Sequence, residues 1–210
     1  MINPFKEKSM DTMINFSGGI DSVYVAWRYL TENPNKILLI HHVVLKTREK
    51  RWHKGKVAVN EVLAWFKKKG LDNFEYVETS VDISNLYPRM FDSTLTDFMQ
   101  IAILRCQKYS TVVNVLNNTP KNEYERLGEA ELERRWVIPR EFRKVTKTDY
   151  INTIPKLKDM YKIDIIRDMP KELFELCWYC RRPTASGGTC GQCHTCKQVE
   201  KALYDLKREK

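Results

Sequence analysis

The chain has 210 residues, of which 42% are hydrophobic and 30% are charged, with eight glycines and eight prolines. This composition excludes a disordered or fibrous protein, and the length suits one domain or one domain with a small appendage. No apolar stretch approaches the roughly 20 residues of a membrane-spanning helix, and residues Met1 to Lys8 show no secretory signal. We therefore expect a cytoplasmic protein without membrane contact and with reduced thiols.

The formal net charge is +9. An excess of positive charge favours polyanionic or phosphorylated partners, but it is as typical of an ordinary soluble surface. Basic residues gather in two stretches, Lys46 to Lys56 and Arg134 to Lys147, and either could line an anionic cleft. Direct nucleic-acid binding stays open without being favoured, and so does a homodimer.

Apolar runs alternate with amphipathic segments along the chain. Parallel strands need helical crossovers, so this alternation predicts an α/β fold with a doubly wound, mainly parallel sheet. The expected strands are 12–16, 36–44, 74–78 and 111–116. The expected helices are one through Val23 and Leu30, then 57–69, 95–106, 123–136, 147–160, a short helix from Pro170, and 198–210.

The loop Ser17-Gly18-Gly19-Ile20-Asp21-Ser22 connects the first expected strand to the first expected helix. Its two glycines allow a sharp turn that exposes main-chain N–H groups, and a helix N-terminus and two serine hydroxyls lie beside them. The loop therefore predicts a pyrophosphate site, with Asp21 placed to hold Mg²⁺. It is not a Walker A loop, because no Gly-Lys-Ser/Thr follows. A simple helix cap with a glycine turn is the alternative.

Five of the six cysteines lie between positions 177 and 196. Cys180 followed by Cys190-Gly-Gln-Cys193-His-Thr-Cys196 supplies four thiolates for a tetrahedral zinc ion. Cys177 in place of Cys180, an iron–sulfur cluster, and a redox pair of Cys177 with Cys180 remain as alternatives. The sixth cysteine, Cys106, is expected in the core. We place a boundary near Met169–Pro170, with an α/β domain over 1–169 and a zinc-binding helical segment over 170–210.

The sequence from Ser17 to Ser22 resembles the S-G-G-x-D-S signature of the PP-loop ATP pyrophosphatases, which adenylate a substrate and release pyrophosphate. Trp178-Tyr179-Cys180 and the Cys190–Cys196 run are similar to the zinc segment of the 7-cyano-7-deazaguanine synthase group, and Thr146-Lys147-Thr148-Asp149 is similar to its T-K-x-E/D helix start. The resemblance implies catalytic roles for Asp21 and Lys147. It further implies ATP and Mg²⁺ at Ser17, Gly18, Gly19, Asp21 and Ser22, and a structural zinc ion at Cys180, Cys190, Cys193 and Cys196.

By this resemblance the enzyme is an ATP-dependent carbon–nitrogen ligase that converts 7-carboxy-7-deazaguanine and ammonia to 7-cyano-7-deazaguanine. The chain departs from the family pattern at 51–55 and 87–92. A related enzyme that stops at the amide or uses another amine is therefore the first alternative. A second alternative is a tRNA-modifying PP-loop sulfur transferase, and a third is a zinc-knuckle nucleic-acid binder without catalysis. A flat acceptor would stack on rings such as Trp52, His53, Tyr87 and Phe91. His41 and His42 are expected to be structural or base-stacking.

Overall fold

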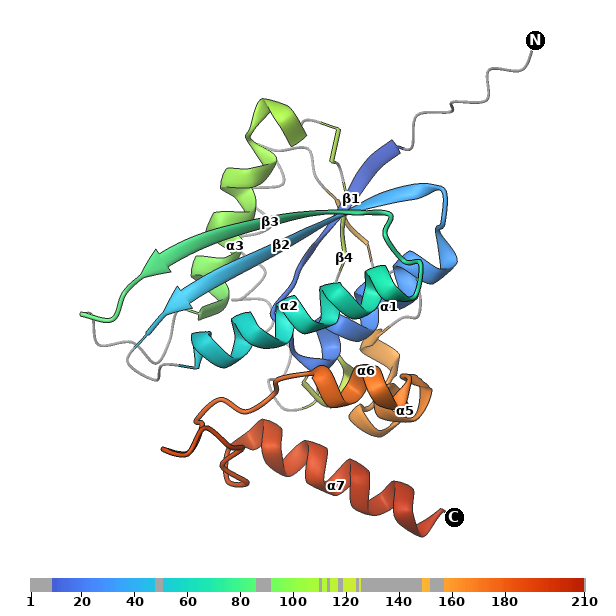
Figure 1. Ribbon diagram of the computed structural model, residues 1–210, viewed down its shortest axis with the longest axis vertical. Helices are drawn as coiled ribbons and strands as arrows, with labels where there is room; N and C mark the ends of the chain where they lie inside the picture. The colour runs from blue at the N-terminus through green and yellow to red at the C-terminus, as the bar shows by residue number, and fades with distance from the viewer. Residues whose placement is uncertain are drawn as a thin grey trace.

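The computed structural model describes residues 9–47, 51–85, 92–109, 111–112, 114–116, 119–123, 125, 149–151 and 157–209. Within these residues five parallel strands form one sheet in the order β3-β2-β1-β4-β5 (Figure 1). The order reverses direction between β1 and β4, and open α/β sheets bind ligands at the carboxyl edge near such a point. The strands are β1 Ser9–Asn15, β2 Lys36–Lys46, β3 Phe74–Asp82, β4 Asn114–Leu116 and β5 Asp149–Ile151.

Helices cover both faces of this sheet, which confirms the doubly wound α/β prediction (Figure 1). Helices α1 (Ile20–Glu32) and α2 (Trp52–Lys68) pack on one face, and α3 (Asp92–Leu104) packs on the other. The C-terminal helices α5 (Lys162–Asp168), α6 (Lys171–Leu176) and α7 (His194–Arg208) lie on the side of α1 and α2. None of the described helices is long and apolar enough to cross a membrane.

The core explains why β2 is a nearly continuous apolar run. Leu38 and Ile40 point into the larger apolar cluster, which includes α1, α2 and residues of α5, α6 and α7. Leu39 points the other way and packs with Met13 and with Ile103 of α3. Successive side chains of a strand alternate between faces, so a strand covered on both faces must be apolar throughout.

Two sequence predictions are wrong. The helix expected over 147–160 is contradicted at Asp149–Ile151, which form β5 and pair in parallel with β4. A three-residue strand has no usable periodicity, so its neighbours in the sheet decide its conformation. Cys106 is exposed rather than buried, because α3 ends at Leu104 and the chain turns into a short 3-10 helix, Gln107–Tyr109. Most of the helix expected over 123–136 lies outside the described residues.

The short helix expected after Pro170 is α6, and the expected C-terminal helix is α7, which begins earlier than predicted, at His194. Both join the core, since Leu173 of α6 and Val199 of α7 are fully buried in the larger apolar cluster. The end of α7 is also tied to α5, because Arg167 donates to both carboxylate oxygens of Glu209 at 2.8 and 2.7 Å. The cysteine-rich segment between α6 and α7 is therefore anchored at both ends.

Candidate functional site

The Ser-Gly-Gly loop leaves β1 and turns directly into α1. The N–H of Ser17 donates to the hydroxyl of Ser22 at 3.2 Å, and the N–H of Gly19 donates to the hydroxyl of Ser17 at 3.3 Å. Ser22 is buried, whereas Ser17, Gly19 and Asp21 line an open pocket. Among the predicted phosphate-binding residues, Ser22 thus shapes the loop while these three border the space that a ligand could occupy.

Gly18 is required by the turn itself. Its φ of +72° is in the left-handed region, which side chains with a Cβ rarely adopt. An added Cβ would also lie only 3.1 Å from the carbonyl oxygen of Gly55 and 3.1 Å from Cγ2 of Val59, both in α2. The first glycine of the loop therefore permits both the turn and the close packing of the loop against α2.

Lys162, the first residue of α5, brings a buried positive charge to the loop. Its ammonium group forms an ion pair with the carboxylate of Asp21, in the first turn of α1. The side chain of Lys162 is 5% exposed and that of Asp21 is 28% exposed. The loop lacks the lysine of a Walker A motif, so the tertiary structure supplies a cation here from a distant part of the chain. No motif in the sequence pointed to this residue.

The predicted catalytic lysine, Lys147, lies outside the described residues. A second Lys-x-Asp sequence, Lys162-Ile163-Asp164, does begin a helix. Its aspartate accepts a hydrogen bond from the backbone N–H of Tyr161 at 2.9 Å, as an acidic residue at the third helical position commonly does. This capping pattern marks a helix start at Lys162, but it does not indicate that the lysine reaches Asp21.

An open pocket of about 320 Å³ is bordered by the loop and by the carboxyl end of β2, within the size range of small-molecule sites. Its wall includes three cations, Arg51, Lys162 and Arg181, and two anions, Asp21 and Glu123. The remaining lining residues are Ser17, Gly19, Ile20, His42, Val43, Val44, Leu45, Trp52, Gly55, Thr119, Pro120, Trp178, Tyr179, Cys180, Thr195 and Gln198. Positive side chains and main-chain donors together suit an anionic ligand.

Residues Trp178–Arg181, which we call the C-terminal strap, form one wall of this pocket. The backbone N–H of Trp178 donates to the carbonyl of Gly18 at 2.9 Å, and its indole N–H donates to the carbonyl of Cys180 at 3.0 Å. The ammonium group of Lys54 lies 5.7 Å from the centre of the same indole ring. The strap thus connects the loop, α2 and the first thiol of the cysteine cluster.

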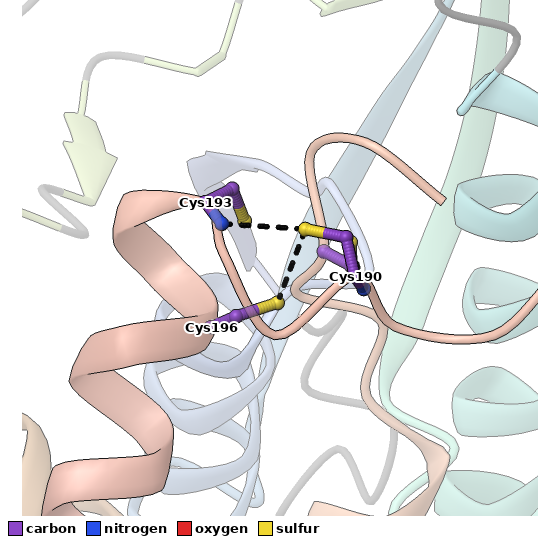
Figure 2. A group of neighbouring side chains, drawn as sticks. Cys190, Cys193 and Cys196 are labelled. Carbon is purple, nitrogen blue, oxygen red and sulfur yellow. Dashed lines mark hydrogen bonds between the residues drawn. The ribbon is translucent and has the colours of Figure 1, made fainter. Parts of the chain in front are cut away.

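The side chains of Cys180, Cys190, Cys193 and Cys196 meet at the start of α7, and Figure 2 shows the last three. All four sulfur atoms lie within 4.8 Å of one another, and those of Cys190 and Cys196 are 4.0 Å apart. A tetrahedral ion with metal–sulfur bonds of about 2.3 Å requires sulfur atoms about 3.8 Å apart. The cluster therefore has the dimensions of a site for a single metal ion, and Cys180, not Cys177, is its fourth member.

A backbone N–H group favours the thiolate form of one cysteine in the cluster. The N–H of Cys193 donates to the sulfur of Cys190 at 3.3 Å, and this hydrogen bond is the main cause that lowers the pKa of the Cys190 thiol to about 6. Cys177 differs, because burial strongly raises the pKa of its thiol. Its S–H donates to the carbonyl of Leu173 at 3.4 Å, as a core residue would.

Of the other ring residues named in the sequence analysis, some line the pocket and some do not. Trp52 lines the pocket and stacks on the ring of His53, with ring centres 3.3 Å apart. Tyr87 and Phe91 lie outside the described residues. His194 contacts Glu123, with 3.3 Å between Nε2 and the carboxylate, and is not part of the thiol cluster.

His41 and His42 are both buried in the middle of β2. His41 Nε2 lies 2.8 Å from the hydroxyl of Thr79 on β3, and burial lowers its pKa to about 4. His42 lines the pocket, and its Nδ1 lies 2.7 Å from the carbonyl oxygen of Phe16. The two histidines therefore occupy different surroundings despite being neighbours in sequence.

No family model and no curated protein matches the chain. Among solved structures, it is similar to the U34-tRNA thiolase NcsA from Methanococcus maripaludis with its [4Fe-4S] cluster. The TM-score is 0.50 at 16% sequence identity, and the match covers 97% of this chain and 68% of that chain. At this identity the likeness concerns the fold. Together with the parallel strand order, the match shows that the chain has an α/β fold like that of this thiolase.

Proposed function

We propose that the chain binds ATP in this pocket and transfers its AMP group to an acceptor. An oxygen of the acceptor attacks the α-phosphorus, the bond from that phosphorus to the bridging oxygen of the β-phosphate breaks, and pyrophosphate leaves. A nucleophile then attacks the activated carbon, and AMP leaves with the former acceptor oxygen. The observation that carries the proposal is the meeting of the loop, the N-terminus of α1 and the Asp21–Lys162 pair in one pocket.

The chain's own groups suit this chemistry. Main-chain N–H groups at the start of α1 can bind the leaving pyrophosphate, since the first N–H groups of a helix have no partner within it. The ammonium group of Lys162 can offset the negative charge that develops on the phosphates. Mg²⁺ is expected to accompany ATP, and Asp21 is the loop carboxylate that could ligate it. Catalysis then depends on positioning and electrostatics, without a side-chain nucleophile.

The first expected result is that acceptor-dependent turnover yields AMP and pyrophosphate. The reason is that the loop has no lysine of the Walker A kind for γ-phosphoryl transfer. Products from α-³²P- and γ-³²P-labelled ATP can be separated by chromatography after incubation with Mg²⁺ and acceptor. ADP and orthophosphate as the acceptor-dependent products would contradict the proposal.

The acceptor we propose first is the carbonyl oxygen of a tRNA base, with a sulfur nucleophile. The fold likeness to a tRNA thiolase favours it, and the net charge of +9 suits a polyanionic substrate. The second candidate is 7-carboxy-7-deazaguanine with ammonia as nucleophile, leading to a nitrile, an amide or another conjugate. The Trp178-Tyr179-Cys180 and Cys190–Cys196 sequences favour that candidate.

One mass-spectrometric experiment separates these acceptors. The protein is incubated with ATP and Mg²⁺ and either tRNA and sulfide or 7-carboxy-7-deazaguanine and ammonium. We expect an ATP-dependent replacement of oxygen by sulfur in a nucleoside of the digested tRNA. Conversion of the deazaguanine carboxylate, with unmodified tRNA, would instead support the second candidate.

We propose that the metal at the four cysteines is a structural zinc ion. The four sulfurs are close enough together for one tetrahedral ion. A four-iron cluster, in which each thiolate binds a different iron, needs sulfurs spread further apart. Four thiolates also close the coordination shell, as in structural rather than catalytic zinc sites.

A further inference from the structure

His42 has one ring nitrogen without a hydrogen-bond partner within the described part of the chain. The residue is 4% exposed and lines the pocket. Its Nε2 is buried and makes no hydrogen bond there, although its Nδ1 is engaged with the carbonyl oxygen of Phe16. A buried polar atom left without a partner is costly. A ligand that supplied the missing partner would therefore gain affinity at this position.

The tautomer of His42 follows from its one hydrogen bond. A carbonyl oxygen can only accept, so Nδ1 carries the proton and donates it. Burial lowers the pKa of His42, so the ring is neutral at physiological pH and Nε2 offers a lone pair. The nearby charges are Glu78, opposite His42 on β3, and Lys56 of α2. These two form an ion pair at 2.7 Å, and they act on the pKa of the ring in opposite directions.

The position of the ring limits what it can bind. Phe16 immediately precedes the loop, so the ring lies beside the chain that enters the loop, and Val43 to Leu45, which follow His42 in β2, line the same pocket. The phosphate oxygens of Mg·ATP carry no protons at neutral pH and cannot donate to Nε2. Beyond the phosphates of a nucleotide, the next donors are the hydroxyl groups of the ribose.

We propose that Nε2 of His42 accepts a hydrogen bond from a ribose hydroxyl of ATP whose phosphates lie on the Ser17–Asp21 loop. The inference rests on the proposed ATP site and deepens it. It assigns His42 to recognition of the sugar, where sequence analysis expected a structural or base-stacking role. The pocket wall from His42 to Leu45 would then border the nucleoside part of ATP.

His41 provides a matched control for this assignment. It is also buried, and its Nδ1 likewise has no hydrogen-bond partner within the described residues. However, it does not line the pocket, and its Nε2 lies against Thr79. A change at His41 therefore removes a buried imidazole from the same strand without removing an acceptor from the pocket.

The experiment compares ATP, 2′-deoxy-ATP and 3′-deoxy-ATP by calorimetry with Mg²⁺ and no acceptor. We expect the wild-type protein to bind one of the two deoxy analogues about 5- to 30-fold more weakly than ATP, as for loss of one hydrogen bond. His42→Phe should bind ATP more weakly and no longer distinguish that analogue from ATP. His41→Phe, if folded by circular dichroism, should discriminate as the wild type does.

Equal binding of all three nucleotides by the wild type would overturn the inference, and so would unchanged discrimination by His42→Phe. A protein that binds none of them would instead overturn the proposed ATP site. If His42→Phe fails to fold, the ¹⁵N resonance of Nε2 in wild-type protein serves as the readout. It should move when ATP binds and move less with the weaker analogue, and a resonance unmoved by ATP would also overturn the inference.

Discussion

The Lys162→Met protein is expected to fold and to release pyrophosphate from ATP at least about a hundredfold more slowly than the wild type. Removing one group that stabilises developing charge in a shielded site typically lowers a rate by about 10²- to 10³-fold. Methionine fills similar space without the ammonium group, so the side chain, only 5% exposed in the wild type, stays packed. Rates measured with saturating ATP and acceptor, together with the melting temperature, check this expectation.

Asp21→Ala removes the other member of the ion pair and should differ from Lys162→Met in its effect on stability. It leaves the buried ammonium group of Lys162 without its carboxylate, and breaking a buried ion pair from one side costs about 3–5 kcal/mol. We therefore expect a lower melting temperature for Asp21→Ala than for Lys162→Met, although both lose activity. Lys171→Met, at a lysine of α6 that is 86% exposed, is the matched control and should behave as the wild type. Near-normal rates for Lys162→Met would show that Lys162 has no role in the mechanism.

Loss of the metal is expected to weaken ATP binding by at least about tenfold as well as to destabilise the C-terminal segment. The thiol cluster includes Cys180, and Cys180 belongs to the strap whose Trp178 donates to Gly18 in the loop. Structural zinc contributes on the order of 10 kcal/mol to folding in small zinc-binding peptides, so the strap should loosen without it. Elemental analysis and calorimetry with ATP, before and after chelation, measure the two effects.

Two cysteine variants compare a thiol inside the cluster with a thiol outside it. Cys193→Ser should lose the metal and bind ATP weakly, whereas Cys177→Ser should keep both properties, because Cys177 lies in the core outside the cluster. Iron with a visible charge-transfer spectrum in place of zinc would contradict the proposed metal. Full ATP affinity in the metal-free protein would contradict the coupling between strap and loop.

The sequence by itself determined the features that depend on short-range patterns. A buried strand, a Gly-Gly turn and a helix start follow one another within Thr12 to Ser22, so local backbone preferences specify the loop. The run from Cys190 to Cys196 brings three thiols together through a turn and the first residues of α7. The alternation of strands and helices likewise predicted the parallel α/β sheet, because each pattern spans enough residues to show its period.

Only the tertiary structure decided which distant residues meet. Lys162 reaches Asp21 from 141 positions away, through the packing of α5 against α1 rather than through any local pattern. The same holds for β5, where three residues take their conformation from pairing with β4, and for Cys180, which joins the cluster while Cys177 turns into the core. In each case the deciding free energy comes from burial and pairing between elements, and a single stretch of sequence does not carry that information.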